Sequence, residues 1–380
     1  MRHRTALLMN FIAPYRVKLL QRFAARVGEL RIFVSTRMEP NRHWTPDWSG
    51  LDVVLQKTLT MPWKFRRRSG TSQQTYLHFP FDTVPHLRRH KPDVVISGEL
   101  GLRSLQAALY RATHRHCRLV IWATLSEHTE KEWGQARRLL RHTILARADA
   151  VVVNGRSGES YIRRFNADVP IVIMNQPADV SLFSRCPIGR VPQQAYRLMY
   201  SGRLIESKGV AAAQADIAAW AAAHPDRLVE ITWAGEGEMR TTLERASTPA
   251  NMRQTFTGHL GYDELARLYG ESGALILPTL FDEWGLVVNE ALASGIPVLG
   301  SIYSQAVEEL VEDGSTGWHF DPLQPGSLTT ALDRFFGASP TQLAEIRVQA
   351  RARGLSVTFD TAAARLVEAT EAAMSVQPAT

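Results

Sequence analysis

The stretch 279-TLFDEWGLVVNEALASGIPVLGS-301 decides the fold of this chain. The apolar run Ala274–Leu277 precedes it and stops at a proline, which predicts a short buried strand. Within the stretch, Leu286–Ala293 is apolar at helical spacing and is followed by a glycine and a proline that end a helix. The stretch therefore predicts the order strand, loop, helix, strand.

Three residues of this stretch have the chemistry of a phosphate and sugar site. Gly285 stands where the helix begins, so its backbone can approach a ligand, and the free N–H groups of the first turn favour an anion. Asp282 precedes it in the loop and Glu290 follows in the helix, at most about 12 Å apart at a helical rise of roughly 1.5 Å per residue. This spacing allows one carboxylate on each side of a diphosphate, to bind a sugar and a ribose. The alternative is a capped helix with solvated acids.

The same stretch resembles the Glu-x7-Glu signature of the retaining glycosyltransferases of family 4 (glycosyl transferases group 1), which have the GT-B fold. Aligned on Trp284-Gly285-Leu286, the first Glu of the signature falls on Asp282 and the second on Glu290. Glu283 lies beside Asp282, and either carboxylate could take the first role. The resemblance implies that this element binds a nucleotide-diphosphate sugar through Asp282, Glu283, Trp284, Gly285, Leu286, Val287 and Glu290.

A second motif carries two cations. Ser201–Gly209 reads SGRLIESKG and resembles the family pattern G-R-L-x-x-x-K-G, so Gly202 is expected beside the donor. Arg203 offers a planar fork for phosphate oxygens, and Lys208 offers a point charge. No Asp-x-Asp occurs in the chain, so the usual carboxylate pair for a nucleotide-bound metal is missing. We therefore expect no metal and no cofactor, and we expect the cation pair to neutralise the departing diphosphate.

Two glycines complete the donor site that the resemblance implies. Gly235 lies at the end of the predicted strand Ile231–Ala234, in a G-x-G pattern that matches the family. Gly258 lies in Phe256–Leu260, which matches a family loop near the nucleotide base. A simple turn between strand and helix is the alternative interpretation of the loop that contains Gly258.

The first half of the chain alternates strand-like and helical runs, which predicts a parallel α/β sheet whose ligands bind at the carboxyl ends of the strands. His128 follows the predicted strand Arg118–Trp122, where family members often contact the transferred sugar, and Glu127 is the second candidate there. Glu99 ends another predicted strand and is a weaker candidate for binding the acceptor. Arg16 follows the first strand, in a loop that lacks the Gly-Gly pair of many members.

Length and resemblance together predict the domain organisation. A chain of 380 residues suits two domains of ordinary size. The resemblance implies two Rossmann-like domains facing across a cleft: residues 1–177 bind the acceptor and residues 178–357 bind the donor. Residues 358–380 form a terminal helix that packs back on the first domain.

Composition narrows the class of protein. The chain is 45% hydrophobic and 21% charged, as expected for a soluble globular protein. No uninterrupted apolar run approaches the roughly 18 residues that a membrane-spanning helix needs. Cys117 and Cys186 are the two cysteines, which predicts a reducing cytoplasm without disulfides or a cysteine metal cluster.

The charge is divided unevenly along the chain. Residues 1–176 contain 29 Lys and Arg against 13 Asp and Glu, a net charge of +16; the remaining 15 and 24 give −9, and the total is +7. No nucleic-acid motif accompanies this charge, so the expected partner is an anionic lipid surface or a lipid-diphosphate acceptor. The segment Met61–Gln74 is predicted to be a surface loop that contacts it through Trp63, Lys64, Arg66, Arg67 and Arg68. Solubility alone is the alternative role of the charge.

The resemblance implies a retaining, metal-independent glycosyltransferase that uses a UDP- or GDP-linked sugar. Its hydroxyl acceptor would be a lipid-linked or polysaccharide precursor, met in the cytoplasm at the inner face of the membrane. Two alternatives stay open. A sugar-nucleotide 2-epimerase of the same architecture would turn over donor without an acceptor, and a non-catalytic subunit would bind donor without turning it over.

Overall fold

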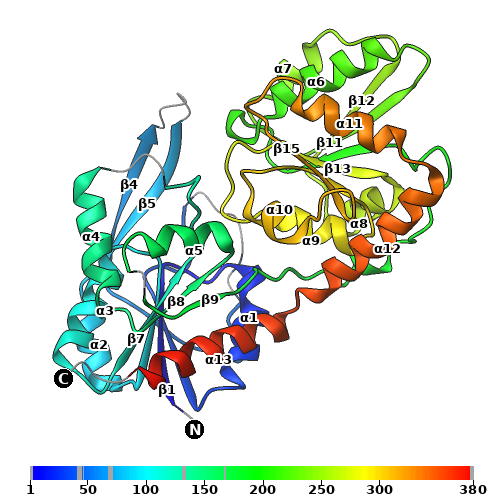
Figure 1. Cartoon of the computed structure of the whole chain (residues 1–380). Coiled ribbons are helices and arrows are strands. Elements are labelled where there is room, and N and C mark those ends of the chain that lie inside the picture. Colours follow the sequence, from blue (N-terminus) through cyan, green and yellow to red (C-terminus); the bar gives the residue numbers. More distant parts are fainter. Residues whose placement is uncertain are drawn as a thin grey trace. The chain divides into compact units, whose positions relative to one another are not determined.

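The computed structural model describes residues 3–40, 45, 47–66, 72–130, 134–166 and 168–376. The chain divides into two compact units (Figure 1). Unit 1 contains Met1–Gln176 together with Phe359–Thr380, and unit 2 contains Pro177–Thr358. Each unit has its own parallel sheet with helices on both faces, so the predicted α/β fold class is confirmed.

Unit 1 contains a parallel sheet of seven strands in the order β3-β2-β1-β6-β7-β8-β9. The strands are β1 (Arg4–Met9), β2 (Glu29–Val34), β3 (Asp52–Leu55), β6 (Val94–Gly98), β7 (Arg118–Ala123), β8 (Ala150–Val153) and β9 (Ile171–Ile173). The helices are α1 (Pro14–Ala24), α2 (Thr83–His90), α3 (Leu102–Thr113), α4 (Gln135–Leu145), α5 (Arg156–Arg163) and α13 (Phe359–Ser375). Every residue of β7 and β8 is buried, because helices cover both faces of a parallel sheet.

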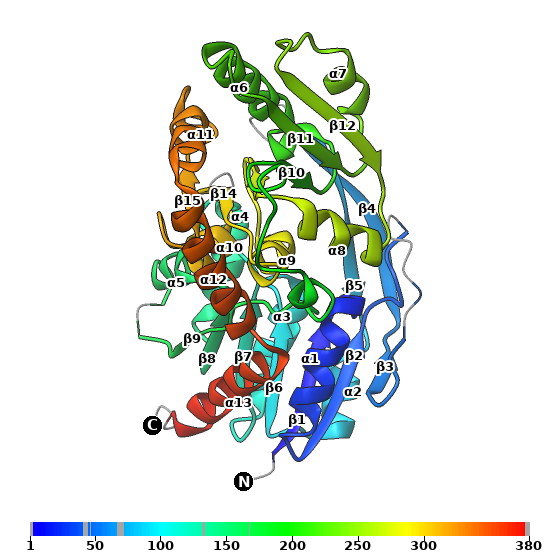
Figure 2. The same ribbon diagram turned by 90° about the vertical axis from the view of Figure 1, so that its right-hand side faces the viewer.

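The terminal helix α13 belongs to unit 1, as the predicted fold class requires. It packs against α1 and against strands β7, β8 and β9 (Figure 2). Its buried face is mostly alanine, with Leu366 in the same apolar core as Leu20 and Phe23 of α1. At its first turn, Asp360 accepts a hydrogen bond at 2.6 Å from Arg26, which lies in the turn after α1.

The predicted surface loop over Met61–Gln74 is wrong for the part of it that the structure describes. β4 (Thr58–Arg66) and β5 (Ser72–Pro80) form an antiparallel hairpin that extends away from the seven-stranded sheet (Figure 1). The cluster of cations suggested a surface loop, but the segment forms a two-stranded ribbon. Pro62 lies opposite Tyr76 in this ribbon, where a missing N–H is tolerated. Arg67 and Arg68 lie outside the described residues.

Unit 2 contains a parallel sheet of six strands in the order β12-β11-β10-β13-β14-β15. The strands are β10 (Leu198–Ser201), β11 (Val229–Ala234), β12 (Met252–Gly258), β13 (Ala274–Leu277), β14 (Val298–Ser301) and β15 (Gly317–Phe320). The α-helices are α6 (Val210–Ala223), α7 (Arg240–Arg245), α8 (Tyr262–Glu271), α9 (Leu286–Ala293), α10 (Gln305–Leu310), α11 (Ser327–Gly337) and α12 (Pro340–Ser356). Two 3-10 turns, η1 (Phe183–Arg185) and η2 (Glu206–Lys208), complete the unit.

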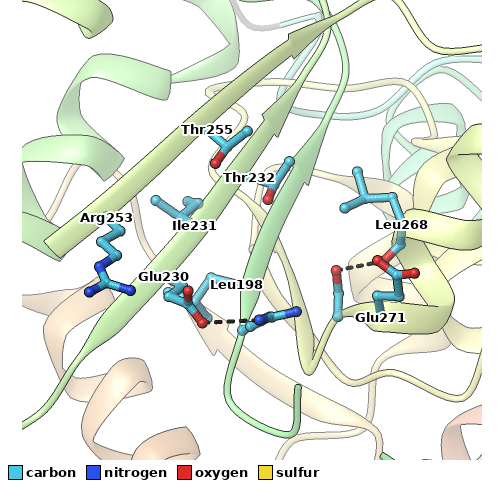
Figure 3. Close-up of a pocket in the computed structure, with 10 residues that line it drawn as sticks. Leu198, Glu230, Ile231, Thr232, Arg253, Thr255, Leu268 and Glu271 are labelled. Atoms are coloured by element: carbon cyan, nitrogen blue, oxygen red, sulfur yellow. Dashed lines mark hydrogen bonds and ion pairs between the residues drawn. The ribbon is translucent and has the colours of Figure 1, made fainter. Parts of the chain in front are cut away.

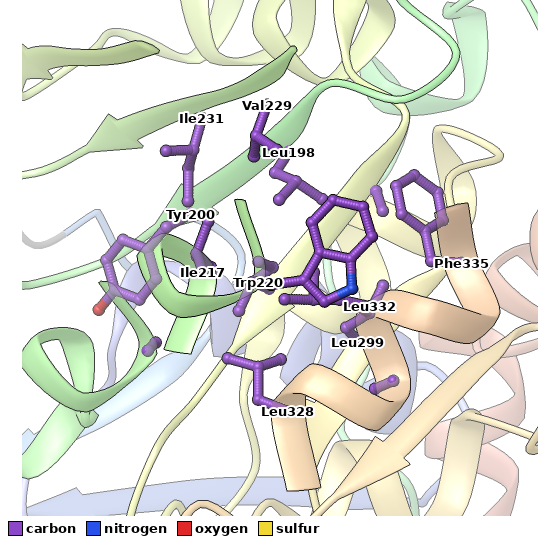
Figure 4. Close-up of a cluster of buried hydrophobic side chains, with 14 of the residues drawn as sticks. Leu198, Tyr200, Ile217, Trp220, Val229, Ile231, Leu299, Leu328, Leu332 and Phe335 are labelled. Atoms are coloured by element: carbon purple, nitrogen blue, oxygen red, sulfur yellow. The ribbon is translucent and has the colours of Figure 1, made fainter. Parts of the chain in front are cut away.

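One face of the unit 2 sheet packs on α6 and α11 (Figure 4). Trp220 of α6 stacks on Phe336 of α11 with ring centroids 4.3 Å apart, and its indole N–H donates to Asp333 at 2.6 Å. Burial of aromatic side chains on this scale stabilises the sheet strongly. Among the residues that the structure describes, no helix combines the length and the apolar character needed to cross a bilayer.

The strand order locates the ligand sites. In each sheet the order reverses beside the first strand: between β1 and β6 in unit 1, and between β10 and β13 in unit 2. Open parallel sheets bind ligands outside the carboxyl ends of their strands at such a reversal, because the connecting loops diverge there. Each unit therefore has one position where its sequence motifs can form a site.

Candidate functional site

The reversal in unit 2 brings together a cation and a carboxylate that the sequence predicted separately. Lys208 ends η2, which follows β10, and Asp282 lies in the loop after β13. Lys208 Nζ lies 2.5 Å from Asp282 Oδ2, and both side chains are only about one-fifth exposed. Leu280 N–H donates to the carbonyl oxygen of Ser207 at 3.1 Å, so backbone as well as side chains joins the two loops.

Glycines allow the neighbouring loops to approach closely. Gly235 follows β11 with φ +145°, and a Cβ at this position would lie 1.8 Å from the carbonyl oxygen of Gly202. Gly202 N–H donates to the carbonyl of Ala234 at 3.0 Å, and Gly235 forms a bridge with Gly258. The predicted Gly202, Gly235 and Gly258 therefore lie together at one end of the sheet.

Arg203 lies in the same loop as Gly202. Its side chain is exposed, and it makes no ion pair with any residue of the described ranges. Its backbone carbonyl accepts a hydrogen bond from Tyr200 Oη at 2.8 Å. The guanidinium is thus available to a ligand, while the backbone beneath it is held.

The start of α9 is presented to solvent without a cap. Gly285 is its N-cap residue with φ +117°, and no side chain caps the first turn. Trp284 is buried, and its indole N–H donates to Asn289 Oδ1 at 2.9 Å, while Ser304 Oγ donates to its carbonyl at 2.5 Å. Trp284 thus fixes the loop from inside, and the start of α9 has the N–H groups that favour an anion. Leu286 and Val287, the next two residues, are partly buried, whereas Glu283 is exposed.

Glu290 lies one turn further along α9. Tyr269 Oη of α8 donates to Glu290 Oε2 at 3.2 Å. Burial raises the pKa of the Glu290 carboxyl to about 7, and the hydrogen bond from Tyr269 acts in the opposite direction. A carboxyl poised near neutrality ionises readily when a hydroxyl-rich ligand supplies hydrogen bonds.

His128 and Glu127 lie in unit 1, in the turn after β7. The Glu127 carboxylate pairs with Arg164, and its backbone N–H donates to Ser157 Oγ at 3.0 Å. His128 is partly exposed in the same turn. The remaining site candidates, from Gly202 to Glu290, all lie in unit 2.

The reversal in unit 1 forms a pocket between the loops after β1 and β6. Asn10, Arg16, Glu99 and Arg103 line it. The guanidinium of Arg16 lies 5.0 Å from the ring centroid of Trp122, and Thr124 Oγ1 donates to the Glu99 carboxylate. The predicted Arg16 and Glu99 are therefore part of one pocket.

A second pocket lies on unit 2, near the amino ends of its strands (Figure 3). Its charged groups are partly neutralised, since Arg197 Nε lies 3.0 Å from Glu230 Oε2. It is lined by strand residues such as Thr232 and Thr255 rather than by the motif loops. It is therefore not the candidate site. Within the described ranges, no group of three or more His, Cys, Asp or Glu side chains is placed to hold a metal ion.

Two contributors to these sites have no local signal in the sequence. Tyr269 lies 21 residues before Glu290, on a different helix, so only the fold reveals the contact. Arg103 follows Glu99 by four residues and lies inside an amphipathic helix, where an arginine usually points to solvent. Its position in the first turn of α3 was the one available hint.

Comparison with known proteins shows similarity to glycosyltransferases in sequence and in fold. Residues 195–337 match the family model described as glycosyl transferases group 1. Glycogen synthase of Mycobacterium tuberculosis is 33% identical over 165 residues, which cover 43% of this chain and 39% of that protein. D-inositol 3-phosphate glycosyltransferase of Streptomyces scabiei is 24% identical over 394 residues, which cover 95% of this chain and 86% of that protein.

The solved structure of Anabaena Alr3699/HepE in complex with UDP has the same fold. It superposes with a TM-score of 0.71 over 97% of this chain and 99% of its own, at 15% identity. The same Anabaena protein is also known in complex with UDP-glucose.

The chain therefore has the GT-B fold of glycosyltransferases. More particularly, residues 195–337 resemble the glycosyl transferases group 1, and this matched segment lies within unit 2.

Proposed function

We propose that this protein is a retaining glycosyltransferase that moves a sugar from a nucleotide-diphosphate sugar to a hydroxyl acceptor. The observation that carries the proposal is the Lys208–Asp282 ion pair beside the uncapped start of α9. Cations and free N–H groups at the carboxyl ends of parallel strands suit a diphosphate, and the two carboxylates suit hydroxyl groups on either side of it.

Each residue of the unit 2 site has a role in this proposal. Lys208, Arg203 and the N–H groups that follow Gly285 stabilise the charge that develops on the leaving diphosphate. Asp282, held by Lys208, takes the first acidic role and accepts sugar hydroxyls, while Glu290 accepts the ribose hydroxyls. The protein contributes mainly by positioning and electrostatics.

The reaction needs no protein nucleophile. The acceptor hydroxyl attacks the anomeric carbon from the face that the diphosphate leaves. The bond from that carbon to the phosphate oxygen breaks as the new glycosidic bond forms. The hydroxyl proton passes to the departing phosphate oxygen, so the configuration is retained. His128, in this proposal, orients the transferred sugar.

The donor is a UDP- or GDP-linked sugar, and no further cofactor or metal takes part. The complexes of the Anabaena protein with UDP and UDP-glucose support a uridine donor. Arg203 and Lys208 supply the positive charge that a divalent ion provides elsewhere.

The acceptor is a lipid-linked or polysaccharide precursor met at an anionic membrane surface on the cytoplasmic side. One face of the β4–β5 hairpin supports this, because Leu59, Met61 and Trp63 are 57%, 46% and 51% exposed. Leu77 lies opposite Met61 and is also exposed. Arg67 and Arg68 lie between the two strands in the sequence, so cations follow the apolar residues closely along the chain. Both cysteines are free, which is consistent with a reducing compartment.

A thermal-shift screen of the full chain against UDP- and GDP-linked sugars tests the proposal, because a ligand that binds only the folded state raises its melting temperature. Mass spectrometry of the products then separates the alternatives. Transfer to an added hydroxyl acceptor supports the glycosyltransferase, an epimer formed without acceptor identifies the 2-epimerase, and binding without any product identifies a non-catalytic subunit. No shift with any nucleotide sugar contradicts the proposal.

A further inference from the structure

The pocket of unit 1 contains a buried arginine without a carboxylate partner. Arg103 is 6% exposed, and the only hydrogen bond of its side chain within the described residues goes from Nη2 to the amide oxygen of Asn10. Its Nε is buried and has no partner in the part of the chain that the structure describes. A buried guanidinium with an unmet donor is costly, which indicates that a ligand completes it.

The other buried arginines of unit 1 are neutralised within the fold. Arg118 Nη1 lies 3.2 Å from Asp149 Oδ1, and Arg141 pairs with Glu130. Burial lowers the pKa of Arg103 to about 10, and the negative charge of Glu99 acts in the opposite direction. The Nε of Arg141 is also buried without a partner among the described residues, so what distinguishes Arg103 from Arg118 and Arg141 is the missing carboxylate partner.

A second guanidinium and a helix start lie in the same pocket. Arg16 in the first turn of α1 lies over the ring of Trp122, 5.0 Å from its centroid, which orients the cation. Ala13, the N-cap residue of α1, has no side-chain cap and also lines the pocket. Both features favour an anion there.

Glu99 gives the pocket one carboxylate as well. Thr124 Oγ1 donates to it, and the backbone N–H of Glu99 donates to the carbonyl of Trp122 at 2.9 Å. Glu99 has φ +64°, a left-handed conformation that is uncommon for a residue other than glycine. An ionised carboxylate accepts hydroxyl hydrogen bonds and repels anions, so the pocket distinguishes two parts of a ligand.

We propose that this pocket binds a hydroxyl acceptor that carries an anionic group, a phosphate or a carboxylate. The anionic group lies against Arg103 and Arg16, and a hydroxyl of the same molecule donates to Glu99. This inference rests on the proposed glycosyltransferase function and specifies the substrate class for the acceptor.

Isothermal titration calorimetry of the full chain tests the inference with glucose, glucose 6-phosphate, glucuronic acid and UDP. Charge-assisted hydrogen bonds predict that at least one charged sugar binds about tenfold or more tightly than glucose. Binding of glucose 6-phosphate alone identifies a phosphate, and binding of glucuronic acid alone identifies a carboxylate. Arg103→Gln and Arg16→Gln should each remove this preference and leave UDP binding unchanged, whereas Arg16→Lys should retain part of it. Arg89→Gln, which removes an exposed cation of α2, is the matched control.

Equal affinity for glucose and both charged sugars overturns the inference, and so does binding of UDP without binding of any charged sugar. A parallel loss of UDP affinity in both arginine variants also overturns it, because the pocket would then serve the donor. Arg16 is partly exposed, so Arg16→Gln decides the matter if Arg103→Gln does not fold. Charged-sugar binding without binding of any UDP- or GDP-linked sugar supports the pocket but contradicts the proposed function.

Discussion

Lys208 Nζ and Asp282 Oδ2 lie 2.5 Å apart, although 74 residues separate them along the chain. The contact joins the loops after β10 and β13, the two strands between which the sheet order of unit 2 reverses. The pair is held in place before any ligand binds. The Lys208 ammonium is therefore already oriented when a diphosphate binds, and Asp282 lies beside it to accept a hydrogen bond from a sugar hydroxyl.

Removing either cation of this site should reduce the rate of transfer. For Lys208→Ala and Arg203→Ala we expect a loss on the order of 3 kcal/mol of transition-state stabilisation, or about 100-fold in kcat at saturating donor. Steady-state kinetics with the cognate donor measure the effect. Arg245→Ala, which removes an exposed cation at the end of α7, should leave kcat unchanged. Near-normal turnover of both site variants would show that the leaving group lies elsewhere.

Donor binding should strengthen as pH rises through neutrality. The pKa of Glu290 is raised to about 7 in the unliganded protein, so the carboxylate that accepts ribose hydroxyls is mostly protonated at pH 6 and mostly ionised at pH 8. A single group with this pKa predicts up to about tenfold tighter binding of UDP-glucose over this range. Calorimetry at several pH values measures it. In Glu290→Gln, the affinity for UDP-glucose should no longer change with pH. If the pH dependence were unchanged in this variant, another group would be responsible for it.

Transfer should proceed in the presence of a strong chelator. Arg203 and Lys208 neutralise the diphosphate in this account, and their charge does not depend on a bound ion. Activity measured with excess EDTA should equal that of the untreated enzyme. If EDTA abolished activity and magnesium or manganese restored it, Arg203 and Lys208 would not be the groups that neutralise the diphosphate.

Gly235→Ala should destabilise the protein by several kcal/mol or prevent folding. The new Cβ would lie 1.8 Å from the carbonyl oxygen of Gly202, and backbone cannot move away as a flexible side chain can. Gly337→Ala in α11 is the matched control, because a Cβ there meets nothing within 4 Å. It should be neutral or stabilise by up to about 1 kcal/mol. Urea unfolding of both variants measures the difference.

The hairpin should bind anionic membranes. Vesicles that contain an anionic lipid should sediment the protein at low salt, neutral vesicles should not, and salt should release it, since cations near such a surface contribute about 1 kcal/mol each. Replacing Met61 and Trp63 together by Ser should weaken sedimentation severalfold. Leu109→Ser, at an equally exposed apolar position on α3, should not. Equal sedimentation of wild type and double variant would exclude the apolar face as the contact.

Local patterns were enough to predict most of the fold. Helix α9 occupies the predicted Leu286–Ala293, because this segment is apolar at helical spacing and is followed by a glycine and a proline. The β4–β5 hairpin was missed because the cations of this segment indicated a surface loop, whereas the alternation of Leu59, Met61 and Trp63 is that of a strand. A strand in an isolated ribbon lacks the continuous apolar run of a buried parallel strand.

Only those site residues that belong to sequence motifs could be predicted from the sequence. Lys208, Asp282 and Glu290 stand out from the sequence, but the Lys208–Asp282 contact depends on the strand order. The raised pKa of Glu290 depends on the burial provided by α8, which no local pattern specifies. Arg103 was missed for the same reason, since its burial and its unmet Nε are properties of the packed unit.

A crystal structure of the protein with UDP tests the central claim most directly. We expect the diphosphate within about 3 Å of Lys208 Nζ and of the N–H groups that follow Gly285, with the ribose hydroxyls at Glu290. A nucleotide bound elsewhere, such as in the pocket lined by Arg197 and Glu230, with the Lys208–Asp282 ion pair free of any phosphate contact, would contradict it.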